Sequence, residues 1–361
     1  MKDTIRVLIV DDSRLVRQIL VSMLETVPGF QVVGQAQDGE EAVQMTARLR
    51  PDVVTMDIRM PRLDGLEAIR HIMSTTPTPI VVVAASVYES DLNIAFTAIE
   101  AGALTVVEKP KGITPEAYEA AKKQLVTTIR LMADVQVVTL WQDRKPPHRT
   151  YIRQTKEANE LGVPTNTELI AVAASTGGPG ALRQILQSLP GDLCVPIVTV
   201  QHITPGFTQG FARWLDQETA LQVRIARNGE PVIPGYVLIA PDDTHLVITA
   251  KGTVQLDRTE RVKGQRPSAT RLFNSVAESY GPASVGIVLT GMGEDGADGL
   301  ENLRRAGGYI IAQDEQSCAV FGMPKVAIER GIVDQVLTPE KIASVLQHFD
   351  GRRKSKSHPK H

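Results

Sequence analysis

The stretch Ile5-Arg6-Val7-Leu8-Ile9-Val10-Asp11-Asp12 begins the chain's regular pattern with a short apolar run that ends at two aspartates. Apolar runs and amphipathic segments alternate from there to about residue 110. The other predicted strands are Gln31–Ala36, Val53–Met56, Ile80–Ala84 and Thr105–Val107, and the helical patterns between them include Ser13–Thr26, Gly39–Arg48, Leu63–Met73 and Asp91–Ala101. Such alternation predicts an α/β domain, a parallel sheet with helices on both faces.

The pattern weakens between residues 128 and 167, where proline and small polar residues interrupt both the helix and the strand period. Beyond it, strands and helices alternate again, with a hairpin-like pair predicted at Val237–Thr249. We therefore expect one domain at 1–127, a linker at 128–167, a second α/β domain at 168–349 and a disordered basic tail at 350–361.

The composition restricts the class of protein. The chain has 361 residues, enough for two domains, and a formal net charge of −2, so no overall field favours nucleic acid or a membrane surface. Cys194 and Cys318 are far apart and form no metal-binding or disulfide pattern. Given the small net charge, we therefore expect no nucleic-acid partner. We also expect no membrane insertion, because no apolar run approaches the roughly 20 residues of a membrane span. Without a signal peptide pattern, the expected location is cytoplasmic.

Charged residues follow three strands of the first domain. Asp11 and Asp12 follow the first predicted strand, Asp57 the third and Lys109 the fifth. In an open parallel sheet the loops after the strands' carboxyl ends meet in one crevice. Mutually repelling carboxylates there favour a hard cation such as Mg²⁺, and Lys109 could pair with the oxygens of a phosphoryl group. Alternatively, a loop aspartate such as Asp12 only caps a helix.

Residues 4–125 resemble the response-regulator receiver family, through Val10-Asp11-Asp12-Ser13, Met56-Asp57-Ile58-Arg59-Met60-Pro61, Asp64-Gly65 and Lys109-Pro110. The resemblance implies a flavodoxin-like fold and phosphorylation of Asp57 by a histidine kinase. It also implies Mg²⁺ held by Asp11, Asp12 and Asp57. Two positions depart from the family: Ala84 stands where a Ser or Thr is usual, with Ser86 two residues on, and Val106 replaces the aromatic switch residue.

In the second domain, Ala173-Ala174-Ser175-Thr176-Gly177-Gly178-Pro179-Gly180 follows a predicted strand and opens a helix. Glycines allow a substrate to approach the backbone closely, and a helix N-terminus favours developing negative charge. Both suit a serine nucleophile beside an oxyanion hole. The alternatives are a helix N-cap or a phosphate-binding turn, although no Gly-Lys-Ser/Thr follows as in a P-loop.

A base and an acid are available at two other strand ends. His202 follows the predicted strand Pro196–Gln201 and could take the proton of Ser175. Asp295, in Thr290-Gly291-Met292-Gly293-Glu294-Asp295-Gly296, could orient that imidazole, with its neighbour Glu294 as the main competitor.

Residues 167–349 resemble the chemotaxis protein-glutamate methylesterases. The matching segments are Ala174-Ser175-Thr176-Gly177-Gly178-Pro179, Gln201-His202, Ile239-Ala240-Pro241, Arg266-Pro267-Ser268, Leu289–Gly296 and Phe321-Gly322-Met323-Pro324. The resemblance implies a Rossmann-like domain in which Ser175 is the nucleophile, His202 the base and Asp295 its orienter. Backbone N–H groups around Thr176 and Met292 would stabilise the oxyanion.

The same resemblance implies a substrate and a mode of control. The substrate would be γ-glutamyl methyl esters on methyl-accepting receptor helices, with glutamine deamidation as a possible second activity and no cofactor for hydrolysis. The unphosphorylated receiver would cover the active-site mouth. Thr270 stands where the family tends to carry aspartate, which we expect to alter substrate contacts or the domain interface and not the triad.

The sequence is also compatible with two alternative classes of function. The esterase-like domain could be a non-enzymatic binding platform under receiver control, although Ser175, His202 and Asp295 are all present. A receiver-linked DNA-binding regulator is disfavoured, because the chain has neither a basic helix nor a helix-turn-helix pattern.

Overall fold

The structure is a computed structural model that describes residues 4–84, 96–99, 101–110, 114–135, 137, 164 and 166–356, except for the side chains of 349–356. The chain divides into two compact units, Met1–Thr150 and Tyr151–His361. This division falls within the predicted linker, and each unit is described by itself.

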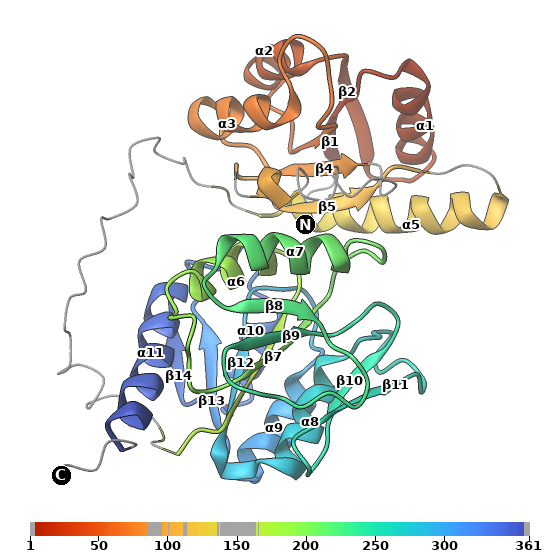
Figure 1. Cartoon of the computed structure of the whole chain (residues 1–361). Coiled ribbons are helices and arrows are strands. Elements are labelled where there is room, and N and C mark those ends of the chain that lie inside the picture. Colours follow the sequence, from red (N-terminus) through yellow and green to blue (C-terminus); the bar gives the residue numbers. More distant parts are fainter. Residues whose placement is uncertain are drawn as a thin grey trace. The chain divides into compact units, whose positions relative to one another are not determined.

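The first unit is a five-stranded parallel sheet of order β2-β1-β3-β4-β5 (Figure 1). Its strands are β1 (Ile5–Val10), β2 (Phe30–Ala36), β3 (Val53–Met56), β4 (Ile80–Ala84) and β5 (Thr105–Glu108). Helix α1 (Arg14–Glu25) contacts α5 (Pro115–Met132), and helix α2 (Gly39–Leu49) contacts α3 (Gly65–Thr75). The predicted doubly wound domain is confirmed, although most of the predicted helix Asp91–Ala101 lies outside the described residues.

The helices of this unit begin where short polar side chains accept backbone hydrogen bonds. Ser13, Asp38, Asp64 and Thr114 are the N-caps of α1, α2, α3 and α5. Ser13 therefore caps α1, which leaves the carboxylate of Asp12 available for other chemistry.

The second unit is a seven-stranded sheet of order β14-β13-β12-β6-β7-β9-β8, in which every neighbouring pair is parallel. Its strands are β6 (Leu169–Ala174), β7 (Ile197–Gln201), β8 (Gln222–Ile225), β9 (Tyr236–Ile239), β12 (Ser284–Val288), β13 (Tyr309–Gln313) and β14 (Gln335–Leu337). The helices are α6 (Gly178–Leu186), α7 (Thr208–Glu218), α8 (Ala269–Ser279), α9 (Ala297–Arg305), α10 (Met323–Glu329) and α11 (Pro339–Lys356), with a 3₁₀ turn at Gly281–Ala283. All residues of β6, β7 and β12 are buried, as expected of central parallel strands.

The hairpin predicted at Val237–Thr249 is wrong, and the antiparallel pair lies farther along the chain. Residues 236–239 form β9, which pairs in parallel with β7 and β8 in the main sheet. The antiparallel pair is β10 (His245–Ile248) with β11 (Val254–Asp257). The apolar run of β9 is buried on both faces of the sheet, which is typical of a parallel strand and not of a hairpin arm.

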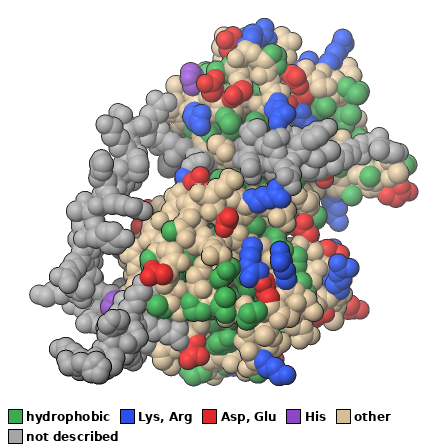
Figure 2. All heavy atoms as spheres, in the orientation of Figure 1, with side chains coloured by type: hydrophobic (Ala, Val, Ile, Leu, Met, Phe, Trp, Pro, Cys, Tyr) green, Lys and Arg blue, Asp and Glu red, His purple; other side chains and the backbone are tan. Residues whose placement is uncertain are grey.

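Two predicted boundaries also differ from the described elements. Helix α5 continues to Met132, into the predicted linker, and α11 continues to Lys356, into the predicted basic tail. Within the described part of the chain, no helix is long and apolar enough to cross a membrane. Acidic and basic side chains both occur on the face of each unit drawn in Figure 2, in keeping with the small net charge.

Each sheet reverses its strand order beside its first strand, and in the second sheet β9 also returns to lie between β7 and β8. In the first unit β1 lies beside β3, and in the second β6 lies beside β12, with the chain winding away in opposite directions on either side. Loops diverge at such a point and leave a crevice at the carboxyl ends of the strands. The predicted functional residues follow these strands and their neighbours.

Candidate active site and phosphoacceptor site

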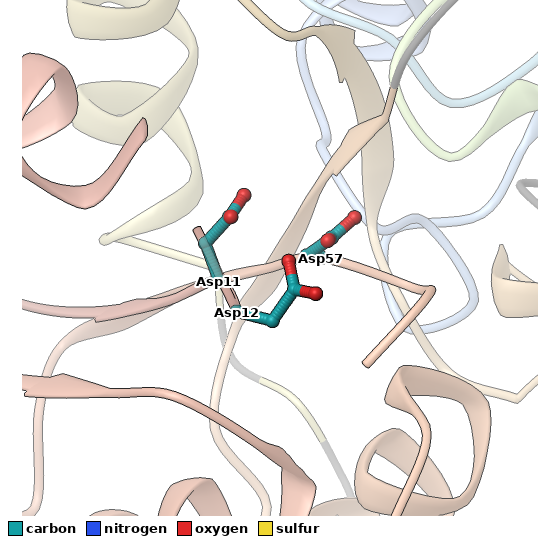
Figure 3. Close-up of side chains that lie close together, drawn as sticks. All are labelled: Asp11, Asp12 and Asp57. Carbon is teal, nitrogen blue, oxygen red and sulfur yellow. The ribbon is translucent and has the colours of Figure 1, made fainter. Parts of the chain in front are cut away.

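Three carboxylates meet at the switch point of the first sheet (Figure 3). Asp11 and Asp12 follow β1, Asp57 follows β3, and each offers an oxygen within 4.8 Å of the others. Asp11 and Asp57 are buried, whereas Asp12 is exposed. Lys109, after β5, has its Nζ 2.8 Å from Oδ2 of Asp11 and 2.8 Å from Oδ2 of Asp57. The four predicted residues are therefore together.

Three carboxylates face one lysine ammonium in this crevice, so negative charge exceeds positive charge there. Burial raises the pKa of Asp57 to about 6, because the opposing effect of Lys109 is too small and the charge of Asp11 adds to the rise. Burial would lower the pKa of Lys109, but Asp57 and Asp11 raise it instead. An all-oxygen set of three close carboxylates fits a hard divalent cation such as Mg²⁺.

The two positions that depart from the receiver family are apolar. Ala84 ends β4, and its carbonyl accepts a hydrogen bond from the Lys109 amide at 2.8 Å. Val106 is buried in β5. Ser86, the nearby hydroxyl that could substitute for Ala84, lies outside the described residues.

The second switch point brings the other predicted residues together on three adjacent strands. Ser175 follows the central strand β6, and its amide donates to the carbonyl of Thr290 after β12 at 3.0 Å. On the other side, the amide of His202 after β7 donates to the Ala174 carbonyl at 2.8 Å. Backbone hydrogen bonds thus extend the sheet to the strand ends that carry Ser175 and His202.

Gln201 joins these two tips, a role that the sequence analysis missed. Its Nε2 donates to the carbonyls of Ser175, at 2.7 Å, and His202, at 2.9 Å. A Cβ at position 178 would lie 2.2 Å from Oε1 of Gln201, so only glycine fits there. The motif Gln201-His202 was visible in the sequence, but the bond from Gln201 to the neighbouring strand was not.

His202, the predicted base, lies next to the predicted acid Asp295. Nε2 of His202 lies 3.0 Å from Oδ2 of Asp295, and both side chains are largely buried. With Nε2 directed at Asp295, Nδ1 is the ring nitrogen available to a serine hydroxyl. The competitor Glu294 is exposed and pairs with Lys263 at 2.9 Å. The structure therefore brings Asp295, and not Glu294, to the imidazole.

Asp295 is held by the N-terminus of α8. Oδ1 accepts from the Ser268 hydroxyl at 2.8 Å and the Thr270 amide at 3.1 Å, and Oδ2 accepts from the Ala269 amide at 2.7 Å. Burial alone would raise the pKa of Asp295, but His202, Ser268 and Ala269 lower it to about 2. The carboxylate is thus fixed in its charged form.

The expectation for Thr270 was wrong in one respect. Besides its amide bond to Asp295, its Oγ1 accepts from the Gly296 amide at 2.9 Å. Thr270 therefore contacts the predicted triad aspartate Asp295 directly and holds the neighbouring Gly296 amide. In the sequence, a serine before the helical pattern of α8 indicates a helix N-cap at Ser268. That pattern does not indicate that the N-terminus of α8 binds Asp295.

The turn after Ser175 does not form a helix cap through a side chain. The N-cap of α6 is Gly177, whose φ of 77° lies in the left-handed region that glycine tolerates. Within the described residues, the amides of Thr176 and Met292 donate no hydrogen bond. A Cβ at Gly291 would lie 2.6 Å from the Cβ of Ser175, so the two loops pack closely. These two amides are available as oxyanion donors.

A half-buried thiol lies near this turn. Cys318 directly precedes Ala319. A Cβ added at Gly177 would lie 2.5 Å from the Cβ of Ala319, so the segment that carries Cys318 packs against this turn. Burial raises the pKa of the Cys318 thiol to about 12, with the charges of Asp314 and Glu315 adding to the effect and Thr290 opposing it.

Known proteins resemble this chain along almost its whole length. Residues 7–116 match the response regulator receiver domain and residues 170–346 match the CheB methylesterase. A protein-glutamate methylesterase/protein-glutamine glutaminase of Myxococcus xanthus is 46% identical over 95% of this chain and 96% of its own length. Another, of Geobacter metallireducens, is 43% identical over 95% of this chain and 98% of its own.

A solved structure supports the same assignment for the second unit. The CheB methylesterase catalytic domain of Thermotoga maritima is 40% identical, with a TM-score of 0.50 over 50% of this chain and 98% of that domain. The chain belongs to the protein-glutamate methylesterase/protein-glutamine glutaminase family, with a response regulator receiver domain preceding its methylesterase domain.

Proposed function

We propose that this chain hydrolyses γ-glutamyl methyl esters on the helices of methyl-accepting receptors, using Ser175, His202 and Asp295. The proposal depends chiefly on one observation: Nε2 of His202 lies 3.0 Å from Asp295, while Ser175 ends the strand next to that of His202. Both features support the assignment of a nucleophile, a base and an orienting acid to these three residues.

The geometry suggests a route for the protons. With the ring proton of His202 on Nε2, which lies 3.0 Å from Oδ2 of Asp295, Nδ1 keeps a lone pair for the hydroxyl of Ser175. As Ser175 Oγ attacks the ester carbonyl, its proton passes to Nδ1, and the imidazolium is stabilised by Asp295. The oxyanion is stabilised by the amides of Thr176 and Met292.

Collapse of this intermediate releases methanol, which takes the proton from Nδ1, and leaves an acyl-serine. Water then attacks the acyl group, gives its proton to Nδ1, and frees glutamate as Ser175 recovers its proton. Deamidation of glutamine would follow the same steps with ammonia as the leaving group. Neither reaction needs a cofactor in this scheme.

We further propose that residues 1–127 act as the regulatory domain, 128–167 as the linker and 168–349 as the catalytic domain. Asp57 is the phosphoacceptor, a histidine kinase is the phosphodonor, and phosphorylation relieves inhibition by the receiver. Asp11, Asp12 and Asp57 would hold Mg²⁺, which neutralises the charge of a phosphoryl group when bound. Lys109 would pair with a phosphoryl oxygen. Both partners would meet the chain in the cytoplasm.

The test is methanol release from isolated methylated receptors, with and without a small phosphodonor. Ser175→Ala should lower the rate at least about a thousandfold, since the nucleophile is lost. Ser344→Ala, at an exposed position on α11, is the matched control and should retain the parent rate. Methanol release that persists in Ser175→Ala would refute the assignment.

A serine-directed fluorophosphonate separates this proposal from a non-enzymatic binding platform. Only a serine activated by a neighbouring base should be labelled. Labelling of the parent but not of Ser175→Ala is expected, and an unlabelled parent would favour the platform.

A further inference from the structure

A second histidine is buried close to the proposed triad without belonging to it. His245 begins β10 and is fully buried. The amide of Ser268 donates to its Nδ1 at 3.1 Å, and its Nε2 lies 3.1 Å from the carbonyl oxygen of Glu260. Because Nδ1 accepts, the ring proton is on Nε2 and points at Glu260. Both nitrogens are therefore used, and the ring is neutral.

The bond to Ser268 is one of three that attach α8 to β10. Farther along the helix, the amide of Ile248 donates to the Ser275 hydroxyl at 3.0 Å, and the Ser279 hydroxyl donates to the Ile248 carbonyl at 2.9 Å. His245 thus supplies the attachment at the N-terminus of α8, and Ile248 supplies the attachment at its C-terminal half.

The N-terminus of α8 is the end that binds Asp295. The Ser268 hydroxyl and the amides of Ala269 and Thr270 all donate to that carboxylate, at 2.7–3.1 Å. Asp295 in turn lies 3.0 Å from His202. A continuous path of hydrogen bonds and close contacts therefore runs from the ring of His245 to the imidazole that serves as the base.

We propose that His245 is a positioning residue, which fixes the start of α8 so that Asp295 meets His202 in the productive geometry. This inference rests on the proposed hydrolytic function. A displacement of about 1 Å in a catalytic site can cost roughly a hundredfold in rate, so a loose helix end would matter even though His245 touches no reacting atom.

Two amide variants separate positioning from simple packing. In His245→Asn the side-chain oxygen can take the place of Nδ1 and accept the Ser268 amide. In His245→Gln the amide group reaches instead to the place of Nε2, near Glu260, and the Ser268 amide loses its acceptor. Both variants replace the ring by a neutral amide, so each is the control for the other.

The measurements are kcat and KM for methanol release by the full chain, with thermal unfolding of each variant. We expect kcat of His245→Gln to fall roughly tenfold to a hundredfold with KM unchanged, as found when groups that orient a site residue are lost. His245→Asn should recover most of this loss. Equal kcat in both variants, whether at the parent value or reduced alike, would overturn the proposal.

A spectroscopic readout does not depend on turnover. The Nε2 proton of His202, held against Asp295, should give a downfield proton resonance that shifts in His245→Gln and is preserved in His245→Asn. An identical resonance in both variants would contradict the positioning role. Failure of the proposed hydrolytic function would appear differently, as a parent that releases no methanol.

Discussion

The two units place a buried aspartate at the same topological position and give it opposite chemistry. Asp57 follows a strand at the switch point of the first sheet, and Asp295 lies in the loop after β12 at the switch point of the second. The pKa of Asp57 is raised to about 6 by burial, whereas that of Asp295 is lowered to about 2 despite burial.

The difference lies in the partners of each carboxylate. Asp57 receives one amide, from Ile58 at 2.8 Å, and shares Lys109 with the neighbouring Asp11. Asp295 receives a hydroxyl and two amides from α8 and faces His202. Asp57 is therefore left short of positive charge, which suits a group that awaits a cation and a phosphoryl donor, while Asp295 is already satisfied and suits a fixed orienting role.

The largest effect should come from removing the charge of Asp295. In Asp295→Asn the amide can donate to Nε2 of His202, which moves the ring proton to Nδ1 and blocks acceptance of the Ser175 proton. We expect kcat for methanol release to fall roughly 10²- to 10⁴-fold. Asp298→Asn changes a nearby half-buried carboxylate that pairs with Lys263, and it should stay close to the parent. A small loss in Asp295→Asn would mean that this aspartate does not orient His202.

The corresponding substitution in the first unit should affect regulation by phosphorylation and not the basal rate of methanol release. Asp57→Asn should abolish the increase in methanol release that a small phosphodonor produces, because the phosphoacceptor is gone. Chelation of Mg²⁺ should abolish the same increase in the parent. Glu67→Gln, on the exposed side of α3, is the control. A phosphodonor response that survives in Asp57→Asn would place the phosphoacceptor elsewhere.

The opposite pKa shifts predict opposite effects on stability. The raised pKa of Asp57 means that its charge costs stability as the pH rises from about 4 to 6. Asp57→Asn should therefore be more stable than the parent at pH 7 without Mg²⁺, by about 3 kcal/mol. The lowered pKa of Asp295 gives stability above about pH 4 that is lost between pH 4 and 2. Asp295→Asn should therefore be less stable at pH 7, by about 2 kcal/mol.

Urea unfolding at pH 7 and pH 3 measures both differences, with hydrogen exchange assigning each to its unit. Both differences should shrink at pH 3. Stability changes of the same sign in the two variants would remove the contrast between the sites.

The smallest expected effect concerns the support of Asp295. Thr270→Val keeps the amide that binds Asp295 but deprives the Gly296 amide of its acceptor. This should cost about 1 kcal/mol of stability and lower kcat by a few fold. Thr270→Ser, which retains the hydroxyl, should behave as the parent. If Thr270→Val matches Thr270→Ser, the hydroxyl has no part in holding the Asp295 loop.

The sequence was informative where the chemistry follows a strand end. Asp57, Lys109, Ser175 and His202 each stand directly after an apolar run, so the topology of a parallel sheet alone predicts that they converge. Ser268, Thr270 and His245 were not predicted as site residues, because none of them follows a strand of the parallel sheet. His245 begins a strand of the antiparallel pair, and Ser268 and Thr270 stand at the start of α8. The hairpin prediction at Val237–Thr249 was wrong because β9 is an apolar run buried in the main sheet, where it pairs in parallel with β7.

The thiol of Cys318 has a practical consequence for the chemistry of the cell. Only the thiolate reacts readily with peroxides and alkylating agents, and a pKa of about 12 leaves almost none of it at neutral pH. A cysteine beside the nucleophile's turn would otherwise be a point of oxidative damage. The raised pKa therefore predicts that Cys318 reacts slowly with oxidants, although it lies close to the turn that follows Ser175.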